Sequence, residues 1–175
     1  MAKLAAAIVP PFSLYAMARS NLQGSVRISI SMTPEQRDRD TCIQFLLGFA
    51  AEGYLKAYLA FDGVNEIQLK AIGHDLVKAY ERALARGLPI QDLYQLRFVI
   101  ETLSLPHRRN FYRYLPNNPD GSEKQFELVR PLLAFESLKL LDRAVFPFLL
   151  PEINRELERQ GRPLLAEWPG VDGLP

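Results

Sequence analysis

Residues 43–63, IQFLLGFAAEGYLKAYLAFDG, decide the fold class of this chain. Their apolar side chains recur at steps of three and four residues, the period of one helix face, at Ile43, Leu46, Leu47, Ala50, Tyr54, Tyr58 and Phe61. Upstream, Thr33-Pro34-Glu35-Gln36 is typical of a helix start, with a capping threonine, a proline in the first turn and a glutamine that completes a capping box. Asp62-Gly63 is a stop signal. The sequence therefore predicts one long central helix between these signals.

The same helical period recurs on both sides of the central helix. Further helices are predicted over residues 12–26, from Asp75 to Gly87, after Pro89 to just before Pro106, from Ser122 through a kink at Pro131, and over residues 152–160. Breaks are expected at Pro147 and Pro151, and only residues 26–30 alternate like a strand, which has no partner. We therefore predict an all-α fold, an antiparallel bundle of four to five helices in one domain over residues 1–161. Residues 1–11 form a ragged leader, and the Pro- and Gly-rich residues 162–175 form a surface tail.

Composition excludes several function classes. The 175 residues carry 21 Lys and Arg against 20 Asp and Glu, so the net charge of +1 excludes a strongly basic nucleic-acid arm or a long acidic tail. One cysteine, Cys42, and two histidines cannot form a disulfide or a cysteine-rich metal centre, and we expect no metal and no cofactor. Cys42 itself is predicted to be a small core residue.

No stretch predicts contact with a membrane. The chain has no run of about 18 apolar residues, the minimum for spanning a bilayer. The apolar N-terminal stretch contains only Lys3 as a positive charge and is interrupted by Pro10-Pro11, which is unlike a secretory signal. We therefore predict a cytoplasmic protein.

Two short stretches on the predicted helices could carry chemistry. Glu52 and Lys56 lie four residues apart in the orientation that favours an ion pair, and we expect a structural pair. His74-Asp75 opens a helix, where free backbone N–H groups and the helix dipole favour a bound phosphate. The alternative is that His74 helps to cap this helix while Asp75 interacts with the dipole or with an arginine such as Arg113.

The segment between the last two long helices combines cations and aromatic rings. It is predicted to be a structured loop from Leu105 to Gly121. Guanidinium groups pair with phosphates and aromatic rings stack on bases, so the loop is the best nucleic-acid candidate. The alternative is that Phe111 and one tyrosine anchor the loop in the core while the arginines face water. The predicted RNA- or nucleotide-binding set is His74, Asp75, His107, Arg108, Arg109, Tyr112, Arg113 and Tyr114.

Three of these motifs, in this order and spacing, give a family resemblance. AEGYLKA at residues 51–57, GHDL at 73–76 and FYRYLP at 111–116 resemble the HEPN family (higher eukaryotes and prokaryotes nucleotide-binding), over residues 14–141. The resemblance implies a helical bundle that usually forms a homodimer and acts in RNA- or nucleotide-linked systems, such as toxin–antitoxin or phage-defence modules. It also implies a possible partner protein such as a nucleotidyltransferase or an antitoxin.

The catalytic signature of that family is absent. Many HEPN proteins are metal-independent ribonucleases with an arginine that precedes a histidine by four to six intervening residues. Residues 67–69, before His74, and residues 100–102, before His107, contain no arginine. The chain therefore resembles a diverged member, and we assign no catalytic residue.

Three functions follow from the sequence. The first is binding of RNA or a nucleotide without catalysis, which requires His74 and the loop arginines to gather around one exposed cleft. The second is a protein-interaction or homodimerisation module, which Tyr54, Tyr58 and other helix aromatics could serve if they are not all buried in the core. The third is a metal-independent ribonuclease with His107 as the acid or base, and we rank it last.

Overall fold

The computed structural model describes residues 10–90, 94–109 and 127–171, and within these ranges every regular element is a helix. The all-α prediction is therefore confirmed. The side chains of residues 38 and 39 are also outside the description. The helices are α1 (Pro11–Ile30), α2 (Pro34–Arg39), α3 (Thr41–Phe61), α4 (Glu66–Ile72), α5 (Leu76–Ala85), α6 (Tyr94–Arg108) and α8 (Pro131–Arg159).

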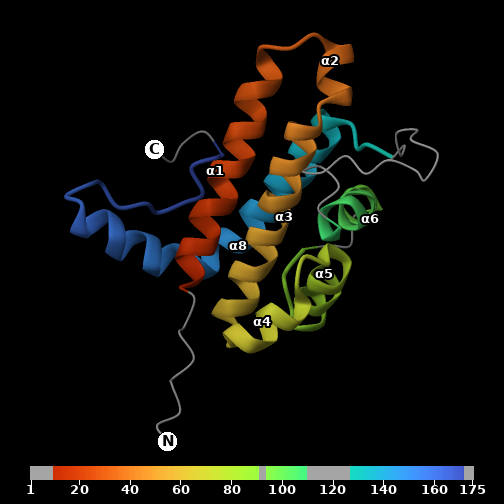
Figure 1. Cartoon of the computed structure of the whole chain (residues 1–175). Coiled ribbons are helices and arrows are strands. Elements are labelled where there is room, and N and C mark those ends of the chain that lie inside the picture. Colours follow the sequence, from red (N-terminus) through yellow and green to blue (C-terminus); the bar gives the residue numbers. More distant parts are fainter. Residues whose placement is uncertain (1–9, 91–93, 110–126, 172–175) are drawn as a thin grey trace, which may run out of the picture.

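Helix α3 is the centre of the bundle. It packs against α1, α8, α5, α6 and α4, and Figure 1 shows α1 and α3 side by side along most of their length. Most of the apolar stripe that the sequence indicates lies in the core, where Ile43, Leu47 and Tyr54 have no exposed surface, whereas Phe61 at its end is 46% exposed. The predicted stripe is thus the face on which the other helices assemble.

The predicted long central helix is two helices. The capping box at Thr33 and Gln36 forms as expected, but α2 ends at Arg39. Asp40 then adopts an extended conformation with φ −76° and ψ 112°, and its side chain accepts a hydrogen bond from the backbone N–H of Ile43. Asp40 therefore caps α3 and separates it from the helix that begins at the Thr33 capping box.

The prolines act differently from the prediction. Pro131 is the first residue of α8, where its missing N–H costs nothing, so it begins a helix and does not kink one. Pro147 and Pro151 lie inside α8 and are exposed, and the helix continues past both to Arg159. Their rings face solvent, where water can satisfy the carbonyl groups that lose an intrahelical donor. Residues 26–30 are also helical, as the last turns of α1.

The described part of the C-terminal segment packs on the bundle. The Arg19 guanidinium donates to the carbonyl oxygens of Gly170 and Val171, and Val171 is 3% exposed. The Trp168 indole N–H donates to the Asp142 Oδ2, 2.9 Å away, and the same oxygen lies 3.0 Å from Arg19 Nη1. Residues 168–171 are therefore held by a buried ion pair between α1 and α8, and the prediction of a surface tail is wrong for them.

Two predictions about single side chains are settled. Cys42 is exposed, so its assignment to the core is wrong; it lies in the first turn of α3, beside the buried stripe. Tyr54 and Tyr58 are buried within the chain, where Tyr54 packs edge-on against Tyr15 and Tyr58 against Phe148. The burial of these tyrosines removes both of them as candidates for an aromatic dimer interface.

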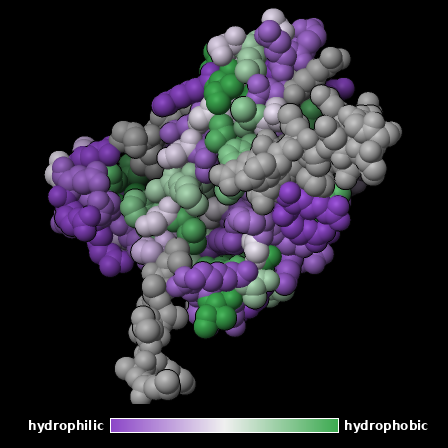
Figure 2. All heavy atoms as spheres, viewed as in Figure 1, coloured by the Kyte–Doolittle hydropathy of each residue, from purple (hydrophilic) through white to green (hydrophobic). Residues whose placement is uncertain are grey.

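The surface is mixed in character. Figure 2 shows hydrophilic residues over the far end of α8 and around α5, with hydrophobic residues in smaller groups between them. Among the described helices, none has the length and apolar character needed to cross a bilayer.

Candidate functional site

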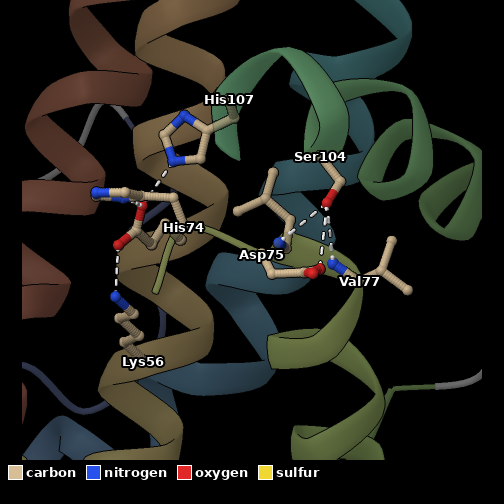
Figure 3. A network of polar contacts seen from close by, with 8 residues as sticks. Lys56, His74, Asp75, Val77, Ser104 and His107 are labelled. Atoms are coloured by element: carbon tan, nitrogen blue, oxygen red, sulfur yellow. Dashed lines mark hydrogen bonds and ion pairs between the residues drawn. The ribbon is translucent and has the colours of Figure 1, made fainter. Parts of the chain in front are cut away.

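A buried carboxylate on α3 is the centre of the most unusual polar arrangement in the described chain. Glu52 Oε2 lies 2.6 Å from His107 Nε2 and 2.8 Å from His74 Nδ1, while Glu52 Oε1 lies 2.6 Å from Lys56 Nζ (Figure 3). An ionised carboxylate can only accept, so both imidazole nitrogens donate a proton to the same oxygen. We call these four residues the Glu52 cluster.

Three different elements supply the Glu52 cluster. Glu52 and Lys56 are one turn apart on α3, His74 is in the turn between α4 and α5, and His107 is in the last turn of α6. Residue Glu52 is 8% exposed and the His107 side chain 2%, whereas the His74 side chain is 46% exposed. The cluster therefore reaches from the core to the surface, with His74 at its outer side.

The ionised form of Glu52 is strongly favoured. Burial alone would raise the pKa of Glu52, but hydrogen bonds from the two imidazoles and the ammonium lower this pKa from its ordinary 4.5 to about 2. Glu52 is thus a buried anion whose bonding capacity is largely used by three donors.

The local sequence of α3 makes room for the two imidazoles. A Cβ atom at Gly48, one turn before Glu52, would lie 2.6 Å from His107 Nδ1, so only glycine allows the ring to sit there unshifted. The Phe49 ring packs edge-on against both imidazoles, with centroid distances of 4.7 Å to His107 and 6.2 Å to His74. Shape and hydrogen bonding therefore fix the same orientation of the rings.

A second polar group joins α6 to the start of α5. The Asp75 Oδ1 accepts from the Lys78 N–H at 3.1 Å, and the Ser104 hydroxyl accepts from the backbone N–H groups of Leu76 and Val77. The Arg108 Nη1 lies 3.0 Å from Asp75 Oδ2. These bonds occupy the first three backbone N–H groups of α5, so a phosphate could bind them only by displacing Asp75 and Ser104.

The charge of Asp75 is stabilised by the same contacts. Burial would raise the pKa of Asp75, but bonds from the Lys78 N–H, Arg108 and Ser104 hold this pKa below its ordinary value. A shallow surface hollow lies beside this group, lined by Asp75, Val77, Lys78, Glu81, Glu101, Ser104, Leu105 and Arg108.

The predicted site residues separate into three groups. His74 and His107 meet at Glu52, Asp75 pairs with Arg108, and Arg109 is exposed at the end of α6. Tyr112, Arg113 and Tyr114 lie outside the described residues, as do Phe111 and the predicted helix start at Ser122, so the alternative of an Arg113–Asp75 pair also falls outside them.

The structure corrects the placement of His107. The sequence puts it in a loop as an RNA contact or as an acid or base, but α6 continues through Pro106 and places His107 in the core. The His107 ring is enclosed between α6 and α3, so RNA cannot reach it directly. The alternative for the start of α5 is right about an arginine partner for Asp75, which is Arg108, but wrong about the cap: Asp75 itself caps α5, whereas His74 bonds to Glu52.

Sequence reasoning found the Glu52–Lys56 pair but missed both histidine partners of Glu52. They lie 22 and 55 residues from it along the chain. The available signal was a glutamate at a core position of the central helix in a chain with only two histidines.

Comparison with family models, with curated proteins and with solved structures finds no match to the chain. The HEPN resemblance therefore stays a prediction from three motifs.

The arrangement has two chemical capacities. His74 keeps an exposed ring whose Nδ1 is fixed by Glu52, so its Nε2 is the nitrogen left for a ligand. In addition, Glu52, His74 and His107 are a group of three potential metal ligands within the described residues, and their ligand atoms all lie within 4.8 Å of one another.

Proposed function

We propose that the protein binds RNA or a nucleotide, without cleaving it, at the edge where the end of α6 meets the turn before α5. The observation that carries the proposal is that the two exposed groups there are each held by an acidic side chain: His74 by Glu52 and Arg108 by Asp75. A side chain that is already oriented loses less conformational entropy when it binds a ligand. These two residues are the ones for which we propose direct contact.

Arg108 suits a phosphate. Its side chain is 50% exposed, and one of its five N–H donors is directed at Asp75, which leaves donors for a second anion. Arg109 follows directly and is also exposed. Two adjacent arginines at the end of α6 give a small basic surface, in keeping with a chain whose net charge is only +1.

His74 suits a nucleoside. Its Nε2 lies on the side of the ring opposite the Nδ1 that donates to Glu52, so in the neutral ring Nε2 has a lone pair that can accept from a base N–H or a ribose hydroxyl. Imidazole rings also stack on unpaired bases. A short single strand or a nucleotide fits this small site better than a duplex, which needs a broad field of positive charge.

Two observations support binding without cleavage. The arginine of the HEPN ribonuclease signature is absent before both histidines. The second histidine, His107, is 2% exposed, so a substrate oxygen cannot come within the hydrogen-bond distance that general acid–base catalysis requires.

The biological setting is proposed from the resemblance alone. A HEPN-like protein would act as a homodimer in a toxin–antitoxin or phage-defence module, with a partner such as a nucleotidyltransferase or an antitoxin. The mass of the purified protein by light scattering tests the homodimer: twice the chain mass supports it, and a mass of 19.9 kDa removes it.

The binding test is fluorescence anisotropy with a labelled single-stranded RNA and with a labelled nucleotide, over a salt series and in the presence of a chelator. We expect salt-dependent binding that weakens in Arg108→Ala and in His74→Ala. For single-stranded RNA, each lost phosphate contact lowers the slope of log K against log salt by about 0.7. Gel analysis of the RNA after the titration checks that it stays intact.

The matched control is Arg155→Ala, because Arg155 is exposed on α8 and its side chain bonds only to a carbonyl of its own helix in the described contacts. Equal affinity of Arg155→Ala and Arg108→Ala, with both variants folded by circular dichroism, would show that binding depends on overall charge and not on this edge. An absence of RNA and nucleotide binding by the wild type would favour the protein-interaction module.

A further inference from the structure

The two histidines of the chain meet at one carboxylate oxygen. No other histidine is present in the sequence, and both lie within 2.8 Å of Glu52 Oε2 although they come from separate elements. A structural role for Glu52 needs only enough donors to compensate a buried charge, and Lys56 already supplies a charged one. The convergence of two imidazoles on the same oxygen therefore calls for a further explanation.

We propose that Glu52, His74 and His107 bind one divalent transition-metal ion of the zinc class. Two imidazoles and one carboxylate form a donor set that such ions favour, and their ligand atoms lie within 4.8 Å of one another. The proposal is independent of RNA binding, because it concerns the buried side of the cluster.

The geometry needs only a small adjustment. Metal–nitrogen and metal–oxygen distances of about 2.0–2.2 Å place tetrahedral donors about 3.3 Å apart. The present distances from Glu52 Oε2 are 2.6 Å to His107 and 2.8 Å to His74, so these two separations must increase by about 0.7 Å and 0.5 Å for the ion to enter. His74 can move, because its side chain is 46% exposed and lies in a turn.

Binding also requires one proton shift on each ring. The nitrogens that now donate to Glu52 must present a lone pair, so the proton moves to the other ring nitrogen. For His74 this is Nε2, on the exposed side of the ring. For His107 it is Nδ1, beside Gly48. For neutral imidazoles this shift leaves the total number of protons on the cluster unchanged.

The surroundings favour a three-ligand site with an open position. Phe49 packs edge-on against both rings and excludes water from one side. The exposed side at His74 gives the ion an entry path and leaves room for a water as a further ligand, as in catalytic zinc sites. Lys56 stays on Glu52 Oε1, so Oε2 is the oxygen left to bind the metal.

Lys56 gives the proposal a second, independent consequence. Its ammonium lies 2.6 Å from Glu52 Oε1 and repels a cation bound at Oε2. Replacement by an uncharged side chain of similar length, Lys56→Met, should therefore tighten metal binding by about 10-fold or more. A surface histidine that captures metal by chance would show no such response.

The test uses the full chain after treatment with a chelator, in a Cys42→Ser background because Cys42 is exposed and thiolates are metal ligands. Titration with Zn²⁺ against a chromophoric chelator gives affinity and stoichiometry, and Co²⁺ gives a visible absorption band that reports the geometry. We expect one ion per chain, with affinity reduced at least about 100-fold in His74→Gln, since loss of mere outer-sphere partners already costs about 10–100-fold. His74 is exposed, so this variant keeps its fold.

A second readout does not depend on any substitution. With only two histidines, the imidazole nitrogen NMR spectrum contains two spin systems, and both must shift on addition of Zn²⁺. Failure of the wild type to bind Zn²⁺ at micromolar concentration, a shift of only the His74 signals, or equal affinity in His74→Gln would each overturn the proposal. Since no RNA is present, and the RNA titrations contain chelator, either proposal can fail without the other.

Discussion

The contact between Gly48 and His107 offers a direct test of how α3 and α6 hold the Glu52 cluster. In Gly48→Ala, the new Cβ would lie 2.6 Å from His107 Nδ1, 3.0 Å from Cγ and 3.3 Å from Cε1. These atoms belong to a ring that is 2% exposed and bonded to Glu52, so it cannot move aside freely. We therefore expect the substitution to displace the ring and to weaken the Glu52–His107 hydrogen bond.

The magnitude follows from two opposing effects. Overpacking a filled core costs about 1–3 kcal/mol, while replacement of a glycine inside a helix by alanine gains about 1 kcal/mol in helix propensity. The net loss in the free energy of unfolding is thus about 0–2 kcal/mol. The steric part is isolated by a double-mutant cycle: in a His107→Ala background the clash is gone, and Gly48→Ala should become stabilising by up to about 1 kcal/mol.

The assay is urea unfolding followed by far-ultraviolet circular dichroism, on the four proteins of the cycle. Gly24→Ala is the matched control, since Gly24 is inside α1 and its nearest new neighbour would be Leu46 Cδ1 at an ordinary 3.7 Å. The free energy of unfolding of this control should rise by up to about 1 kcal/mol, from helix propensity alone. A coupling energy below about 0.5 kcal/mol between Gly48→Ala and His107→Ala would refute the close packing described here.

Three further outcomes are expected. In Gly53→Ala the new Cβ would lie 2.7 Å from the Cβ of Ala18 on α1. We expect the free energy of unfolding to fall by about 1–2 kcal/mol, and calorimetry should show a melting temperature lower by roughly 2–4 °C per kcal/mol. Asp142→Ala leaves the Arg19 guanidinium buried without its anion, and we expect urea unfolding to show a loss of about 3–5 kcal/mol, with the Trp168 fluorescence changed. The pKa of Glu52 falls from 4.5 to about 2 on folding, so ionised Glu52 stabilises the fold by up to about 3 kcal/mol. This stabilisation is complete above pH 4.5 and is lost as the pH falls toward 2. Urea unfolding of the metal-free protein across this pH range should show the loss, and Glu52→Gln should not show it.

Local signals in the sequence were sufficient for the helices and for some of their ends. The capping box at Thr33 forms as its residue types and spacing predict, because each half needs only a side chain and a backbone N–H three residues away. The Glu52–Lys56 pair is predictable for the same reason, since its partners are one helical turn apart. Such contacts depend on no other part of the chain.

Errors arose at one local cap and where tertiary packing overrides a local preference. A helix start at Thr33 and an apolar stripe from Ile43 predict one continuous helix, yet the chain turns at Asp40, whose side chain caps α3. In α8, Pro147 and Pro151 are local breaking signals, but the helix buries Leu141, Val145 and Leu149 against the bundle and continues. Burial of one face of a long helix can exceed the roughly 3 kcal/mol that a proline costs inside it.

The Glu52 cluster shows most clearly what a single sequence leaves open. Its ion pair with Lys56 is local, but its two imidazoles come from positions 22 and 55 residues away and meet only once α3, α5 and α6 have packed. The same face of α3 that forms the core carries both Gly48, which makes space for a ring, and Glu52, which holds it. The site is therefore part of the core, and a change in packing between α3 and α6 should alter ligand binding and stability together. His74 differs from the rest of the cluster: because it is exposed, its replacement should alter binding while stability stays nearly unchanged.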